Sequence, residues 1–141
     1  MTLYVDTSLL VAALTAEART ADAQAWLVAQ PTDELAISDW VITEFSSALS
    51  IKLRTGEISL AKRTEALGAF RRLVSETFTV LAVSAGHFRT AATFADQHAL
   101  AIKAGDALHL AIAAGGGAVL CTLDRRLAEA GPPLGVQTRL L

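Results

Sequence analysis

Four acidic residues in this sequence are placed where they could do chemistry together. Asp6 and Asp124 each follow a short apolar run, and Asp106 stands at the start of a segment with helical periodicity. Glu44 lies in the middle of another helical segment. Four carboxylates from separate segments would supply hard oxygen ligands and high negative charge, which suit Mg²⁺ or Mn²⁺. Bound ions of this kind can activate water for the hydrolysis of a phosphodiester bond.

Glu44 is the acid that carries most weight from physical chemistry alone. It lies on the stripe Val41, Glu44 and Ala48, whose i, i+3, i+7 spacing is typical of the core-facing side of a helix. An acid there is costly to bury unless its carboxylate is paired or bound to a metal. The alternative to a metal site is therefore a buried salt bridge, which requires a nearby Arg or Lys partner.

The three aspartates share a structural alternative. Asp is among the residues preferred at helix N-caps. Asp6, Asp106 and Asp124 each stand at the start of a predicted helix. Taken singly, none of them distinguishes a capping role from a catalytic one.

The elements that must position these acids are strands and helices in alternation. Short apolar strands are predicted at 3–5, 35–38, 78–83, 118–122 and 136–140. Helices are predicted at 9–17 after a polar turn at 6–8, then at 20–30, 39–54, 59–76 and 84–98, and from 106, after Gly105, to 114, with a short helix after residue 124. This order predicts an α/β fold with a parallel sheet covered on both faces. Because such sheets bind ligands at the carboxyl ends of their strands, we expect Asp6 and Asp124 at the binding edge.

Composition sets the broad class of the protein. The chain has 141 residues, of which 52% are hydrophobic, and these values predict one domain spanning 1–141. The sequence has no apolar stretch of membrane-spanning length and no leader-like N-terminus, so we expect a cytoplasmic protein. A net charge of −2 argues against a general nucleic-acid binder, although two bound divalent cations would reverse its sign. The single cysteine, Cys121, cannot form an internal disulfide.

Several other kinds of site do not fit the sequence. The three histidines are scattered singly, so no zinc site is predicted and each is expected to be an ordinary surface or core residue. The run Gly115–Gly117 lacks the Lys and Ser/Thr of a phosphate-binding loop and precedes a strand, so it is a turn. A phosphatase with an Asp-x-Asp motif is excluded because Ser8 stands where the second aspartate should be. A receiver-like signalling domain would need adjacent acids near the first strand and leaves Glu44 unexplained.

Four motifs in order along the chain resemble those of PIN-domain nucleases, most closely VapC-type toxins of type II toxin-antitoxin systems. They are Tyr4–Ser8, Glu44 in its helix, Lys103–Ala111 and Thr122–Asp124. The resemblance covers essentially the whole chain. It implies a three-layer α/β/α sandwich with a central, mostly parallel sheet of four or five strands. It also implies Mg²⁺- or Mn²⁺-dependent endoribonuclease activity, inhibition by a cognate antitoxin, and a homodimer.

The resemblance assigns roles to the acids by position. Asp6, Glu44 and Asp106 look like the central metal-binding and catalytic acids, and Asp124 looks like the supporting acid of the same metal site. Many members of the family have a further acid three residues after the last of these, where this chain has Leu127. The number of bound metal ions, one or two, therefore stays open.

Other site residues follow from the same positions. Thr7, Ser8 and Thr122 look like hydroxyls that orient the acids through hydrogen bonds. RNA must also be held, and contacts from Lys and Arg to phosphates usually dominate its affinity. Among the basic residues, Lys103 and Arg125 adjoin metal-site motifs and are the best RNA-binding candidates, although a solvated surface position is the default for each. The remaining alternative is a PIN-like module that binds RNA or a protein without cutting, and the intact set of acids argues against it.

Overall fold

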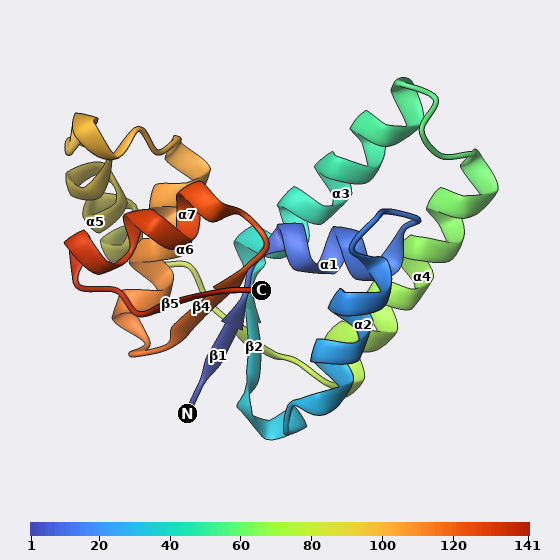
Figure 1. Cartoon of the computed structure of the whole chain (residues 1–141), viewed down its shortest axis with the longest axis horizontal. Helices are drawn as coiled ribbons and strands as arrows, with labels where there is room; N and C mark the ends of the chain where they lie inside the picture. Colours follow the sequence, from blue (N-terminus) through green and yellow to red (C-terminus); the bar gives the residue numbers. More distant parts are fainter.

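The computed structural model describes all 141 residues, and its helices and strands alternate as predicted (Figure 1). In chain order the elements are β1 (Leu3–Val5), α1 (Thr7–Leu14), α2 (Thr20–Ala29), β2 (Leu35–Ser38), α3 (Asp39–Arg54), α4 (Leu60–Glu76), β3 (Thr79–Leu81), α5 (Ala85–Ala95), α6 (Ala104–Gly115), β4 (Val119–Thr122), α7 (Arg125–Ala130) and β5 (Thr138–Leu140). Short 3₁₀ turns precede β2, follow α5 and follow α7.

The five strands form one sheet in the order β3-β2-β1-β4-β5, and every neighbouring pair is parallel. The prediction of a mostly parallel sheet of four or five strands is confirmed. The chain moves outward from β1 to β2 and β3, then crosses back to β4 on the other side of β1. The carboxyl ends of β1 and β4 therefore meet where the direction of winding reverses, which is the usual position of ligand sites in such sheets.

The helices cover both faces of the sheet (Figure 1). Helices α1 to α4 lie on one side, and α5, α6 and α7 lie on the other. Right-handed crossovers between parallel strands explain this division, because the chain winds across the sheet in opposite directions before and after β3. The predicted three-layer α/β/α arrangement is confirmed.

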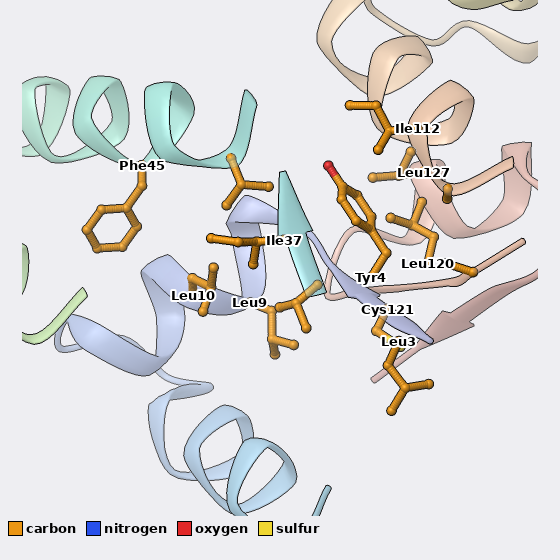
Figure 2. Close-up of a cluster of buried hydrophobic side chains, with 14 of the residues drawn as sticks. Leu3, Tyr4, Leu9, Leu10, Ile37, Phe45, Ile112, Leu120, Cys121 and Leu127 are labelled. Atoms are coloured by element: carbon orange, nitrogen blue, oxygen red, sulfur yellow. The ribbon is translucent and has the colours of Figure 1, made fainter. Parts of the chain in front are cut away.

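The core extends through both interfaces between the sheet and the helices. It is a cluster of 31 buried residues, and all residues of β1, β2 and β4 are buried. Figure 2 shows Leu10 and Phe45 on the α1 and α3 side, and Ile112 and Leu127 on the α6 and α7 side. None of the helices combines the length and the apolar character needed to span a bilayer.

Several element boundaries differ from the sequence prediction. The residues 6–8, predicted as a turn, form the cap and first turn of α1, because the Asp6 side chain accepts a hydrogen bond from the Leu9 N–H. The same helix ends at Leu14 because Thr15 is extended and its carbonyl accepts a hydrogen bond from the Thr20 hydroxyl. Strand β3 is shorter than predicted because it lies at the sheet edge and pairs only with β2. Helix α5 ends at Ala95, and a separate 3₁₀ turn follows it.

Candidate active site

Asp6 occupies the reversal point of the sheet. It follows β1 directly, and its backbone N–H donates to the Cys121 carbonyl in β4. One side-chain oxygen, Oδ1, accepts hydrogen bonds from Ser8 Oγ at 2.7 Å and from the Leu9 N–H at 3.3 Å. The other oxygen, Oδ2, accepts one from Thr122 Oγ1 at 2.7 Å. The capping alternative for Asp6 is therefore correct as far as it goes, but the cap uses only one of the two oxygens.

Burial makes Asp6 chemically unusual. The residue is 3% exposed, and this burial raises the pKa of its carboxyl above the ordinary value for Asp. The hydrogen bonds from Thr122, Ser8 and the Leu9 N–H oppose that shift, because they favour the ionised form. A carboxylate that is held in place and poor in water is a feature of functional sites.

Glu44 approaches the same region from α3. Its side chain is half-buried, and Oε1 accepts hydrogen bonds from Thr7 Oγ1 at 2.6 Å and from His109 Nε2. Burial alone would raise its pKa, but the hydrogen bonds from His109 and Thr7 outweigh burial and hold the pKa below the ordinary value. The second oxygen, Oε2, lies at the first turn of α6, only 3.1 Å from where a β-carbon on Gly105 would stand.

The partner of Glu44 is a residue that sequence reasoning did not assign to the site. The salt-bridge alternative required a Lys or Arg, whereas the structure supplies the imidazole of His109, which is 2% exposed. Behind it, the Tyr4 hydroxyl contacts both His109 and Ser38. A signal was available in the sequence, because His109 stands three residues after Asp106 and thus on the same helix face.

Asp106 lies in the first turn of α6 and is half-buried. The N-cap of this helix is Lys103, so the capping alternative for Asp106 is wrong. Burial raises the pKa of Asp106, and the negative charges of Asp124 and Glu44 raise it further. Asp124 and Glu44 are therefore close enough to Asp106 to affect its ionisation.

Asp124 is the most loosely attached of the four acids. It is exposed and caps α7, with Oδ1 accepting from the backbone N–H groups of Arg126 at 2.9 Å and Leu127 at 3.3 Å. Its own N–H donates to Thr122 Oγ1 at 2.9 Å. The hydroxyl of Thr122 thus links Asp124 to Asp6, and the capping role predicted as the alternative is present here too.

The chemistry of the four acids fits a divalent cation, although their side chains do not form a complete coordination site. All offer oxygen, the donor that Mg²⁺ and Mn²⁺ prefer, and a cation would relieve the mutual repulsion that acts on Asp106. In the conformation described, no three Asp, Glu, His or Cys side chains converge as a metal-binding group. Binding would therefore require rotation of side chains, and the exposed Asp124 and half-buried Asp106 are the ones with room to rotate.

The two basic residues singled out from the sequence lie beside these acids. Lys103 is the exposed N-cap of α6, and Arg125 is the exposed first residue of α7. The only ion pair of Arg125 is with Glu129 at 4.0 Å on the same exposed helix surface, which is worth little. Both side chains are therefore free to contact an anion.

Replacing Gly105 with Ala should weaken divalent-cation binding without unfolding the protein. The new β-carbon would press on Glu44 Oε2 at 3.1 Å and on the Trp40 ring at 3.5 Å. Glu44 cannot yield easily, because its other oxygen is held by two hydrogen bonds. We expect Mn²⁺ affinity, measured by calorimetry, to fall about 10-fold, the lower end of effects seen for residues that orient metal ligands.

Gly68→Ala is the matched control, because Gly68 also lies in a helix and its β-carbon would meet only an arginine side chain at 3.9 Å. It should raise the free energy of unfolding by about 0.5–1 kcal/mol through helix propensity and leave Mn²⁺ affinity unchanged. Equal Mn²⁺ affinities for the two variants would contradict the placement of Glu44 Oε2 at a metal site.

Solved structures of other proteins share this fold. VapC20 from Mycobacterium tuberculosis, a sarcin-ricin loop cleaving toxin, superposes with a TM-score of 0.76 at 20% identity, over 92% of this chain and 95% of that chain. PAE2754 from Pyrobaculum aerophilum gives a TM-score of 0.71 at 25% identity, over 98% and 90% of the two chains. VapBC2 from Rickettsia felis, bound to a DNA fragment from its promoter, gives a TM-score of 0.70 at 19% identity, over 100% of this chain and 99% of that chain.

The sequence itself also matches a known family. The PIN domain family model matches residues 3–131, which include all four acids and all but the last strand of the sheet. No curated protein matches the sequence. Because the family model covers most of the chain and the fold agrees with it, the chain belongs to the PIN-domain family.

Proposed function

We propose that this protein is a metal-dependent endoribonuclease that hydrolyses RNA phosphodiester bonds. The observation that carries the proposal is the hydrogen-bond geometry at the reversal point of the parallel sheet, where Thr122 links the buried Asp6 to Asp124 and Thr7 holds Glu44. The negative charges of Asp124 and Glu44 also raise the pKa of Asp106, and a divalent cation would relieve that repulsion. Membership of the PIN-domain family supports the same conclusion.

In the proposed mechanism, Asp6, Glu44 and Asp106 would hold Mg²⁺ or Mn²⁺, and Asp124 would support them from its exposed position. Such an ion would supply activation of a water and stabilisation of the charge on the leaving oxygen of an in-line displacement. Thr122 and Ser8 hold the Asp6 carboxylate through their hydroxyl groups, and Thr7 holds Glu44. These hydrogen bonds fix the carboxylate orientations before substrate arrives, so that little reorganisation is needed during reaction.

RNA is the proposed substrate, and the exposed basic groups beside the acids are the proposed phosphate contacts. Lys103 and Arg125 flank the acids from the N-terminal ends of α6 and α7. Two positive side chains next to a negative cluster would hold the backbone on either side of the scissile phosphate. Their contacts would be independent of base sequence, because phosphates carry no sequence information.

The proposed biological role is that of a toxin held in check by a cognate antitoxin protein. Support comes from the folds this chain shares with a sarcin-ricin loop cleaving toxin and with VapBC2. We further propose that the protein forms a homodimer and acts in the cytoplasm, where RNA and a co-expressed antitoxin would meet it.

The test is cleavage of a single-stranded RNA by purified protein under controlled metal content. We expect no cleavage after treatment with EDTA and full recovery when excess Mg²⁺ or Mn²⁺ is added, because the carboxylates cannot activate water alone. RNase contamination is excluded by assaying a catalytically dead variant purified in parallel. Cleavage that persists in EDTA would refute the metal mechanism, and RNA binding without cleavage in either metal would favour a non-cutting module.

A further inference from the structure

A buried chain of hydrogen bonds lies behind Glu44. The Tyr4 hydroxyl lies 2.7 Å from Ser38 Oγ and 2.8 Å from His109 Nδ1, and the opposite ring nitrogen, Nε2, contacts Glu44 Oε1. Tyr4, Ser38 and His109 are each at most 2% exposed. Because water cannot reach them, these groups must satisfy one another's hydrogen-bonding capacity. Figure 2 shows the Tyr4 ring among buried apolar side chains of the core.

The direction of these hydrogen bonds follows from counting hydrogens. The ionised Glu44 carboxylate has no hydrogen to donate, so the hydrogen between Glu44 and the imidazole lies on His109 Nε2. In the neutral imidazole Nδ1 then accepts the hydrogen of the Tyr4 hydroxyl, and Ser38 Oγ, which accepts from the Val41 N–H at 3.4 Å, is left to donate to the Tyr4 oxygen.

The other end of the chain is consistent with this direction. Glu44 Oε1 also accepts a hydrogen bond from Thr7 Oγ1 at 2.6 Å. Two donors on one oxygen fix the plane of the carboxylate and leave Oε2 without a hydrogen-bond partner, beside Gly105 at the first turn of α6. Gly105 immediately precedes Asp106, so the free oxygen lies at the turn of α6 that carries Asp106.

We propose that His109 is a positioning residue for Glu44, held in its Nε2–H tautomer by the Tyr4 hydroxyl, which is itself oriented by Ser38. The inference rests on the proposed function, because it assigns Glu44 Oε2 to the metal. His109 acts here as the outer partner of a carboxylate ligand, in the way that a carboxylate often orients a histidine ligand.

Two substitutions of His109 separate positioning from packing. In His109→Gln the amide nitrogen reaches the former Nε2 position and can still donate to Glu44, whereas in His109→Asn it reaches only the Nδ1 position. We expect His109→Asn to lower Mn²⁺ affinity and the RNA cleavage rate by about 10–100-fold, and His109→Gln to restore most of both. His98→Asn is the matched control, because His98 is exposed in the 3₁₀ turn after α5. Thermal unfolding would show which variants are folded.

The tautomer can be observed directly, without metal or RNA. Long-range ¹H–¹⁵N correlation spectra of the wild-type protein at neutral pH should show His109 with a protonated Nε2 and an unprotonated Nδ1, assigned by the loss of these signals in His109→Gln. Tyr4→Phe keeps the ring and removes the donor to Nδ1. It should shift the two nitrogens toward a mixture of tautomers and lower Mn²⁺ affinity.

The outcomes distinguish this inference from the function on which it rests. A hydrogen on Nδ1 in the wild-type protein would overturn the inference, and so would a folded His109→Asn variant that binds Mn²⁺ as tightly as His98→Asn. If the wild-type protein neither binds Mn²⁺ nor cleaves RNA, the proposed function fails. The spectrum would still show whether His109 carries its hydrogen on Nε2 and donates it to Glu44.

Discussion

Asp6→Asn is expected to lower RNA cleavage by at least about 100-fold, the upper end of the losses that follow removal of residues merely supporting a metal site. The asparagine has the same shape but only one acceptor oxygen and no charge, so it binds a divalent cation poorly. Single-turnover cleavage of a labelled RNA at saturating Mg²⁺ measures the loss. Cleavage within a few-fold of the wild-type rate would refute the assignment of Asp6.

The fold should survive this change. Asparagine is as good an N-cap as aspartate, and its oxygen can accept the hydrogen bonds that Ser8 and the Leu9 N–H give to Oδ1. Burial raises the pKa of Asp6 in the folded state, so the folded protein binds that proton more tightly than the unfolded chain and loses stability as pH rises through this range. The Asn side chain does not titrate, so the Asp6→Asn variant does not lose stability in this way as pH rises. We therefore expect its melting temperature at pH 7 to equal or exceed that of the wild-type protein.

Two further aspartates serve as controls for Asp6→Asn. Asp22→Asn removes a charge from an exposed ion pair on α2 and should leave cleavage unchanged. Asp124→Asn keeps the cap of α7 and changes an exposed carboxylate, so its effect on cleavage should be smaller than that of Asp6→Asn. A larger effect at Asp124 would reverse the proposed order of importance among the acids.

Phe45→Ala is expected to cost about 3–5 kcal/mol of unfolding free energy, one of the largest losses available to a single substitution. The Phe45 side chain is fully buried, and its ring stacks on that of Phe70 with centroids 4.1 Å apart. Since natural domains are stable by only about 5–15 kcal/mol, the variant would retain a small margin. Urea denaturation followed by circular dichroism measures the change.

The functional interest of Phe45 lies in its position next to Glu44 on α3. The ring anchors this helix to α4, so its loss should loosen the element that carries the acid. Phe88→Ala is the control, because Phe88 is 57% exposed and its removal should change stability by no more than about 0.5 kcal/mol. Equal stabilities of the two variants would contradict the described packing of α3.

Local signals in the sequence were sufficient for most of the elements. The strand at Leu35–Ser38 and the helix at Asp39–Arg54 have the predicted bounds, because Ser38 supplies both the end of the strand and the cap of the helix. Where the prediction was wrong, the cause was either a side-chain hydrogen bond that periodicity does not reveal or the position of a strand in the sheet. Thr20 ends α1 by donating to the Thr15 carbonyl, and β3 is short because no strand lies on its outer side.

The sequence by itself determined the α/β class, the family resemblance and the four acids, since each depends on residue type, period and spacing along the chain. Only the tertiary structure decided what each acid contacts. It decided that Asp6 is at once a cap and a buried carboxylate, that Asp106 is no cap, and that Glu44 is held by a histidine 65 residues away. The physical reason is that burial and hydrogen bonding between distant segments set the orientation and pKa of a carboxylate, and neither exists until the sheet brings those segments together.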